Sequence, residues 1–140
     1  MSDAHSMLPA LKAAYAHWNE TKGGDTSKWF ALMADEVDLR SLADGGSGLP
    51  FTKPAHTRSE VMRYLEGISE TFTMDFYEVD RFVTEGDMIV VIGRCRWHVK
   101  ATGKVFASPI LTVWRFEDGK AVASHEYYDT AAAALATSPG

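Results

Sequence analysis

Apolar positions in the first half of the chain recur at helical spacing. Across residues 7–18, six apolar side chains follow the i, i+1, i+4, i+7, i+8, i+11 pattern of one helix face. Ser6 can cap this helix, Pro9 suits its first turn, and Gly23-Gly24 marks its end. The pattern therefore predicts an amphipathic first helix.

Two more helices and one strand are predicted before the chain's midpoint. Residues 25–34 begin with possible capping side chains and carry an apolar side, which favours a short helix. Residues 57–60 fit a capping box, and the apolar stripe of the helix that follows it ends at Phe72. Residues 37–42 alternate apolar and polar, as a strand does, and the Gly-, Pro- and Ser-rich stretch 44–54 is predicted to be a loop.

The second half of the chain reads as strands separated by turns. Four strands are predicted, over residues 74–84, 88–100, 104–117 and 120–129. Asp118-Gly119 is a strong two-residue hairpin signal between the last two, and residues 131–140 are a tail of small residues that is expected to form at most a frayed helical turn. Helices followed by meandering strands predict an α+β domain, with three N-terminal helices packed on a curved antiparallel sheet.

Composition narrows the class of protein. The 140 residues suit a single domain, and a net charge of −5 argues against a nucleic-acid binder, which needs a basic surface. Cys95 is the single cysteine, so no internal disulfide can form. The first residues lack a signal-peptide pattern, and no apolar run is long enough to span a membrane. We expect a cytoplasmic protein that binds neither nucleic acid nor membrane.

The hairpin turn predicts which side chains share a face of the sheet. If Glu117 pairs with Lys120, a regular register sets Thr112 opposite His125 and places both on one face. That face would carry Cys95, Trp97, Ser108, Ile110, Thr112, Trp114, His125, Tyr127 and Asp129. Apolar walls with a few polar groups are typical of ligand pockets. The opposite wall would come from the helices, through Tyr15, Trp18, Trp29 and Met33.

The other face of the predicted sheet mixes apolar side chains with arginines. It would carry Arg94, Arg96, His98, Leu111, Val113, Arg115, Glu126 and Tyr128. Arginine and aromatic residues are enriched at subunit interfaces, although a solvated face is also possible. We expect a homodimer formed through this outer face.

The order of elements and three short runs resemble a known family. The runs are LMADE at 32–36, VWRFEDGK at 113–120 and HEYYD at 125–129. With them, residues 8–135 resemble the SnoaL-like polyketide cyclase group of the nuclear-transport-factor-two-like superfamily, which also includes ketosteroid isomerases. The resemblance implies a cone-shaped half barrel. It does not fix an activity, because this fold carries both enzymes and simple binding proteins.

The resemblance assigns roles residue by residue. In SnoaL-like cyclases an Asp that closes the last strand is the acid/base, and Asp129 matches it. Ser41 and Thr112 occupy the two positions at which ketosteroid isomerases carry carboxylates, which argues against that activity. Tyr15 matches the tyrosine that ketosteroid isomerases carry on their first helix. Epoxide hydrolases of the superfamily use an Arg-x-Asp pair, and the run 94–96 lacks the Asp.

Two functional hypotheses follow. In the first, the protein is an enzyme that performs proton transfer without a cofactor or metal, with Asp129 as acid/base and His125 and Tyr127 orienting a small, mainly apolar, cyclic substrate. Predicted substrate contacts are Tyr15, Trp18, Trp29, Met33, Ser41, Trp97, Ile110, Thr112 and Trp114. In the second, the same fold binds a small molecule without catalysis. Asp129 would then only cap the tail, and His125 and Tyr127 would be core residues.

Overall fold

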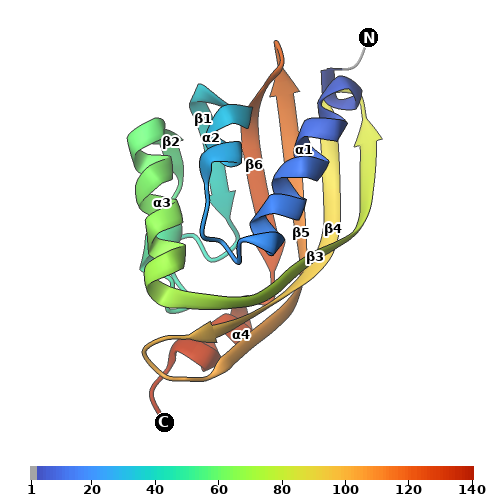
Figure 1. Ribbon diagram of the computed structural model, residues 1–140. Helices are drawn as coiled ribbons and strands as arrows, with labels where there is room; N and C mark the ends of the chain where they lie inside the picture. The colour runs from blue at the N-terminus through green and yellow to red at the C-terminus, as the bar shows by residue number, and fades with distance from the viewer. Residues whose placement is uncertain (1–2) are drawn as a thin grey trace.

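The computed structural model describes residues 3–140. Its elements run in the order α1 (Asp3–Glu20), α2 (Ser27–Leu32), β1 (Met33–Ser41), η1 (Pro50–Thr52), β2 (Ala55–Thr57), α3 (Arg58–Thr71), β3 (Phe72–Glu85), β4 (Met88–Val99), β5 (Val105–Glu117), β6 (Lys120–Tyr128) and α4 (Thr130–Thr137). The predicted α+β class and the three N-terminal helices are confirmed. Helices α1, α2 and α3 lie on one side of a curved sheet, and α4 lies at its end (Figure 1).

The sheet is mixed rather than wholly antiparallel. Its six strands lie in the order β2-β1-β6-β5-β4-β3. The meander from β3 to β6 is antiparallel, as predicted, but β1 runs parallel to β6. The chain returns beside β1 only after it has passed through α3 and the whole meander, so the direction of this pair is set by that long connection and not by a hairpin.

Three local predictions need correction. Helix α1 begins at Asp3, so Ser6 does not cap it and Pro9 lies within the helix. The stretch 44–54, predicted as a loop, contains the short helix η1. The small-residue tail forms α4, whose first turn is capped by the Asp129 side chain. A carboxylate at this position satisfies one backbone N–H that the helix itself leaves unpaired.

The start of α3 follows the sequence prediction. The hydroxyl of Thr57 accepts a hydrogen bond from the backbone N–H of Glu60, and the Glu60 carboxylate accepts one from the backbone N–H of Thr57, at 3.2 Å in each case. These reciprocal bonds fix where α3 begins. Its buried side, which includes Val61, Tyr64 and Leu65, then faces the sheet.

The core lies between the three helices and the inner face of the sheet. Alternate residues of β4 and β5 are buried, including Ile89, Trp97, Phe106 and Phe116. This alternation confirms the predicted inner face for both strands.

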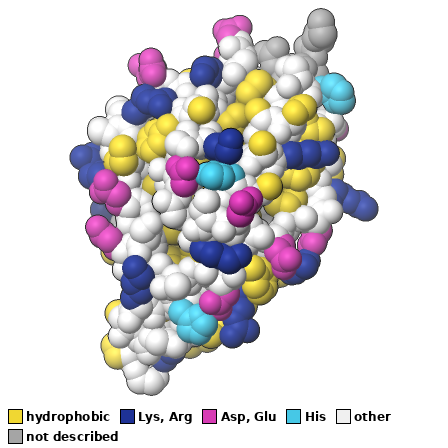
Figure 2. All heavy atoms as spheres, in the orientation of Figure 1, with side chains coloured by type: hydrophobic (Ala, Val, Ile, Leu, Met, Phe, Trp, Pro, Cys, Tyr) yellow, Lys and Arg dark blue, Asp and Glu magenta, His cyan; other side chains and the backbone are white. Residues whose placement is uncertain are grey.

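Seen from the helix side, acidic and basic side chains are scattered over the surface with apolar groups between them (Figure 2), so neither charge dominates that side.

The register of the last hairpin changes after the second residue pair from the turn. Glu117 pairs with Lys120, as predicted, and Phe116 pairs with Ala121. A bulge then shifts the pairing, so that Trp114 lies opposite Ser124 and not opposite Ala123. One extra residue inverts the direction of every side chain that follows. The predicted faces of β6 are therefore wrong beyond the bulge.

The predicted dimer face lies on the outside of the sheet. Arg94 of β4 contacts Asp80 of β3 at 2.5 Å, and Arg96 contacts Asp75 at 2.9 Å. The outer face also exposes Val83 and Ile92. The homodimer stays a prediction.

Within residues 3–140, no helix is both long and apolar enough to cross a membrane.

Candidate active site

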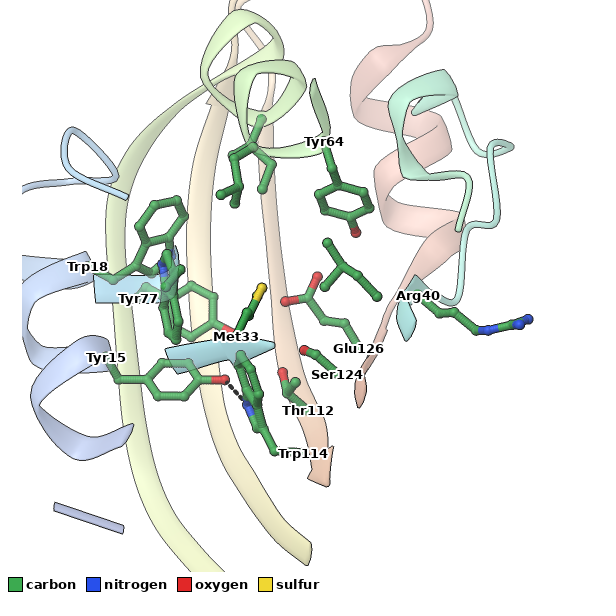
Figure 3. Close-up of a pocket in the computed structure, with 14 residues that line it drawn as sticks. Tyr15, Trp18, Met33, Arg40, Tyr64, Tyr77, Thr112, Trp114, Ser124 and Glu126 are labelled. Carbon is green, nitrogen blue, oxygen red and sulfur yellow. Dashed lines mark hydrogen bonds between the residues drawn. The ribbon is translucent and has the colours of Figure 1, made fainter. Parts of the chain in front are cut away.

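Two adjoining chambers lie between the helices and the inner face of the sheet. Each has a cavity volume of about 60 Å³. Five residues line both chambers and so mark their junction: Trp18, Tyr64, Ile68, Tyr77 and Glu126. Side chains from α1, α3, β3 and β6 therefore meet at one point inside the cone (Figure 3).

Aromatic rings form much of the wall of the first chamber. Tyr15 packs edge-on against Trp29 with ring centres 4.9 Å apart, and Trp29 stacks on Trp114 at 5.6 Å. The indole N–H of Trp114 donates a 2.8 Å hydrogen bond to the Tyr15 hydroxyl. The Tyr15 hydroxyl accepts this bond, so its own proton remains available to another acceptor.

Glu126 is the one carboxylate among the residues that line the two chambers. Its side chain points into the cavity from β6 (Figure 3). None of the described residues donates a hydrogen bond to this carboxylate. Burial without such a partner disfavours the charged form and raises the pKa of Glu126 to about 7. The carboxylate is therefore poised to gain or lose a proton near neutral pH.

Arg40 also borders the first chamber, but its charge is directed elsewhere. The side chain points away from the cavity (Figure 3). Its Nε donates a 2.7 Å hydrogen bond to Asp38 on the outer face of β1. Arg40 therefore does not neutralise Glu126.

Hydroxyl groups surround the Glu126 carboxylate. Thr112 lies opposite Glu126 on the neighbouring strand, and its buried Oγ1 has no hydrogen-bond partner among the described residues. Burial also raises the pKa values of Tyr15, Tyr64 and Tyr77 above the usual range, so these phenols keep their protons. The cavity thus combines one ionisable acid with several neutral hydrogen-bond donors.

Most of the predicted substrate contacts border the chambers. Tyr15, Trp18, Trp29, Met33, Thr112 and Trp114 line the first chamber, and Trp97 and Ile110 line the second with Trp18. Ser41 is buried but lines neither chamber, and its hydroxyl hydrogen-bonds to that of Tyr128. Whether these side chains contact a substrate stays a prediction.

The structure does not bring the three predicted catalytic residues together in the cavity. His125 faces outward, and its Nε2 lies 3.0 Å from Asp38 Oδ2. Tyr127 is 44% exposed on the same outer face. The Asp129 carboxylate is exposed and accepts a 2.9 Å hydrogen bond from the backbone N–H of Ala132. His125 and Tyr127 face outward because of the bulge. It turns Ser124, Glu126 and Tyr128 to the inner face instead.

Sequence reasoning missed Glu126, Tyr64 and Tyr77. The sequence carries one indirect signal for Glu126, because the run Ala121-Val122-Ala123 is apolar throughout and breaks the alternation of a regular strand. Such a break is compatible with a bulge, although it does not say on which strand the extra residue lies.

The capping role of Asp129 leads to a prediction. Asp129→Ala is expected to lower the free energy of unfolding by about 1 kcal/mol, since it removes the N-cap of α4. It should leave any chemistry in the cavity unchanged, because the carboxylate does not line either chamber. Urea denaturation measures the first effect, and activity assays measure the second. Loss of activity at unchanged stability would instead indicate that Asp129 takes part in catalysis.

Comparisons with known proteins agree with this architecture. A family profile described as "SnoaL-like domain" matches residues 11–124. No curated protein gives a significant match. Among solved structures, an NTF2-like protein of unknown function from Burkholderia pseudomallei is 24% identical, with a TM-score of 0.80 and 99% of each chain covered.

Two further structures are similar at lower identity. A protein from Mesorhizobium loti, named for its likeness to SnoaL polyketide cyclases, is 15% identical with a TM-score of 0.71, covering 87% of this chain and 98% of its own. A protein from Catenulispora acidiphila with a ketosteroid isomerase-like fold, crystallised with trimethylamine, is 15% identical with a TM-score of 0.73, covering 94% and 93%. At these identities the likeness concerns the fold, and the profile match gives the family: this chain belongs to the SnoaL-like domain family.

Proposed function

We propose that this protein binds a small, mainly apolar, cyclic molecule in the cone and acts on it by proton transfer, with Glu126 as the acid/base. The observation that carries this proposal is the Glu126 carboxylate at the junction of the two chambers, without a hydrogen-bond donor among the described residues. General acid–base catalysis works best when the pKa of the group lies near the working pH, and burial holds the pKa of Glu126 at about 7.

The hydroxyls beside Glu126 support the same chemistry. When a carboxylate removes a proton from carbon next to a carbonyl group, negative charge develops on the carbonyl oxygen. Tyr15 and Thr112 can each donate a hydrogen bond to that oxygen, since the Tyr15 hydroxyl accepts from Trp114 and keeps its own proton to donate, and Thr112 Oγ1 has no geometric partner among the described residues. Glu126 then returns the proton to another atom of the same molecule, which gives an isomerisation, or to a departing hydroxyl group, which gives a dehydration.

The walls set the character of the ligand. Trp18, Trp29 and Trp114 offer flat apolar surfaces, and the polar groups are few and converge near Glu126. This combination is typical of sites that hold ring-shaped molecules by apolar contact and orient them by one or two hydrogen bonds.

The proposal can be tested with a probe that requires only a base. In 5-nitrobenzisoxazole, loss of the C3 proton to the base breaks the N–O bond, and the ring opens to a nitrile and a coloured phenolate. We expect the protein to accelerate this reaction, with a rate that rises with pH through about 7 as Glu126 ionises. Glu126→Gln should lower the rate by about 10²-fold or more, because the amide cannot accept the proton.

Variants of the outer face provide matched controls. His125→Ala and Tyr127→Phe alter neighbours of Glu126 on the same strand, but both side chains lie outside the cavity. Each should keep the rate and the pH profile of the unaltered protein. If Glu126→Gln folds normally and retains the full rate, Glu126 is not the base. Binding of a small molecule without catalysis would then be the better account of this protein.

A further inference from the structure

The cavity contains one carboxylate, that of Glu126, and no cationic side chain directed toward it. Among the residues lining the two chambers, Glu126 and Arg40 are the only ones whose side chains can carry a charge near neutral pH, and Arg40 is turned outward onto Asp38. The lining contains no lysine and no histidine. When Glu126 is ionised, the protein therefore supplies neither a counter-charge nor a hydrogen bond. A buried carboxylate in that state is costly, and the cost falls when a cation comes within contact distance.

The walls beside this carboxylate are aromatic. Trp18 and Tyr77 line both chambers with Glu126, and Tyr15, Trp29 and Trp114 continue the first chamber. Aromatic rings attract organic cations through their quadrupole, and such rings grouped around one space form the usual site for methylated ammonium groups. Aromatic rings and a carboxylate without a partner favour the same kind of ligand.

We propose that the ligand of this cavity carries one positive charge, as an alkylated ammonium group that lies between the aromatic wall and the Glu126 carboxylate. This inference rests on the cavity and the carboxylate of the proposed function, and it adds the class of ligand. The apolar body of the molecule would occupy one chamber and its ammonium group would lie at the junction, next to Glu126.

Other classes of ligand fit less well. An anion would be repelled by ionised Glu126 and would find no cationic side chain directed into the cavity. A neutral apolar molecule would exclude water and leave the ionised carboxylate without a counter-charge. Of these three classes, only a cation brings the counter-charge that ionised Glu126 lacks.

A pair of molecules of the same shape tests the inference. Choline carries a trimethylammonium group, and 3,3-dimethyl-1-butanol has carbon in place of the nitrogen. Tryptophan fluorescence reports binding, because three tryptophans line the first chamber. At about pH 8 we expect choline to bind about tenfold more tightly than the alcohol, since desolvated cation–π contacts and the charge pair together exceed the ~1.4 kcal/mol that a tenfold ratio requires.

Acidification and substitution should remove this preference. The titratable groups around Glu126 are, on the neighbouring elements, Tyr15 of α1, Tyr64 of α3, Tyr77 of β3 and Cys95 of β4, and, on its own strand, Tyr128. Burial raises the pKa of each above its usual range, so Glu126 alone among the cavity side chains changes charge between about pH 5 and 8. The ratio of the two affinities should fall at pH 5, and in Glu126→Gln at every pH, to the smaller preference that the aromatic wall alone supplies.

The outcomes separate this inference from the proposed function. Equal affinity for the two molecules at pH 8, or no binding of choline, overturns the assignment of a cationic ligand. If turnover of 5-nitrobenzisoxazole by Glu126 persists in that case, the proposed chemistry stands with a neutral ligand. A preference for choline that is undiminished in Glu126→Gln would also overturn the inference, because the carboxylate would then contribute nothing to it.

Discussion

Glu126→Gln is expected to raise the free energy of unfolding by about 3 kcal/mol at pH 8 and to change it little at pH 4.5. The pKa of this carboxyl rises from an ordinary value of 4.5 to about 7 on folding, because the cavity removes it from water. Each pKa unit corresponds to about 1.4 kcal/mol of stability, which gives the expected size of the effect.

The sign follows from proton binding. Between pH 4.5 and 7 the folded protein keeps the Glu126 proton while the unfolded chain has lost it, so stability decreases as pH rises. Above about pH 7 both states are ionised, and the penalty stays constant. Glutamine is neutral throughout, so the variant avoids this penalty and should be the more stable protein wherever Glu126 is ionised.

Thermal or urea denaturation of both proteins between pH 4.5 and 8 measures this effect. The difference between the two curves isolates position 126, since histidines and other carboxylates titrate alike in both. Glu36→Gln, an exposed carboxylate on β1, is the matched control and should leave the pH dependence unchanged. A constant difference between the Glu126→Gln and unaltered proteins over this range would mean that the folded-state pKa is ordinary.

Gly93→Ala is expected to lower the free energy of unfolding by about 3 kcal/mol or more. A Cβ at Gly93 would lie 2.2 Å from the backbone oxygen of Glu78 and 3.1 Å from the Cα of Val79. The register of β3 against β4 shifts between Val79 and Arg81, which makes an irregular pair at this point. Backbone atoms cannot rotate away as a side chain does, so the two strands would have to separate.

A second glycine shows that the effect comes from the contact and not from alanine itself. Gly86 lies in the turn between β3 and β4 with a φ of +60°, and a Cβ there meets nothing within 4 Å. Gly86→Ala should cost about 1 kcal/mol from backbone strain alone. Thermal denaturation should therefore show a much larger decrease in melting temperature for Gly93→Ala. Similar decreases for the two variants would mean that β3 and β4 can separate at Gly93 at little cost in free energy.

The candidate site shows how far a regular pattern extends and where it fails. The alternation of β4 and β5 is strict, and the side chains predicted to face inward from these two strands do so. The same rule applied to β6 selected His125 and Tyr127, and the bulge at Arg115 and Phe116 placed Glu126 inside instead. The helix residues Tyr15 and Trp18 were predicted correctly to border the cavity, because an apolar stripe on a helix has only one face to bury.

The sequence by itself determined the elements of this protein and most of its apolar interior. Helical spacing, the capping box at Thr57 and the Asp118-Gly119 turn are local signals, and each acts within a few residues of the chain. They sufficed for the α+β class, for the antiparallel meander and for the aromatic wall of the cavity.

Only the tertiary structure decided which acid lies in the cavity and which way β1 runs. A single bulge changes the pairing between β5 and β6 by one residue, and the choice depends on how both strands pack against the helices. The direction of β1 depends likewise on contacts between segments that are far apart in the chain. The pKa of Glu126 depends on both, because it is raised by neighbours brought together from α1, α3, β3 and β5, which no local pattern in the sequence encodes.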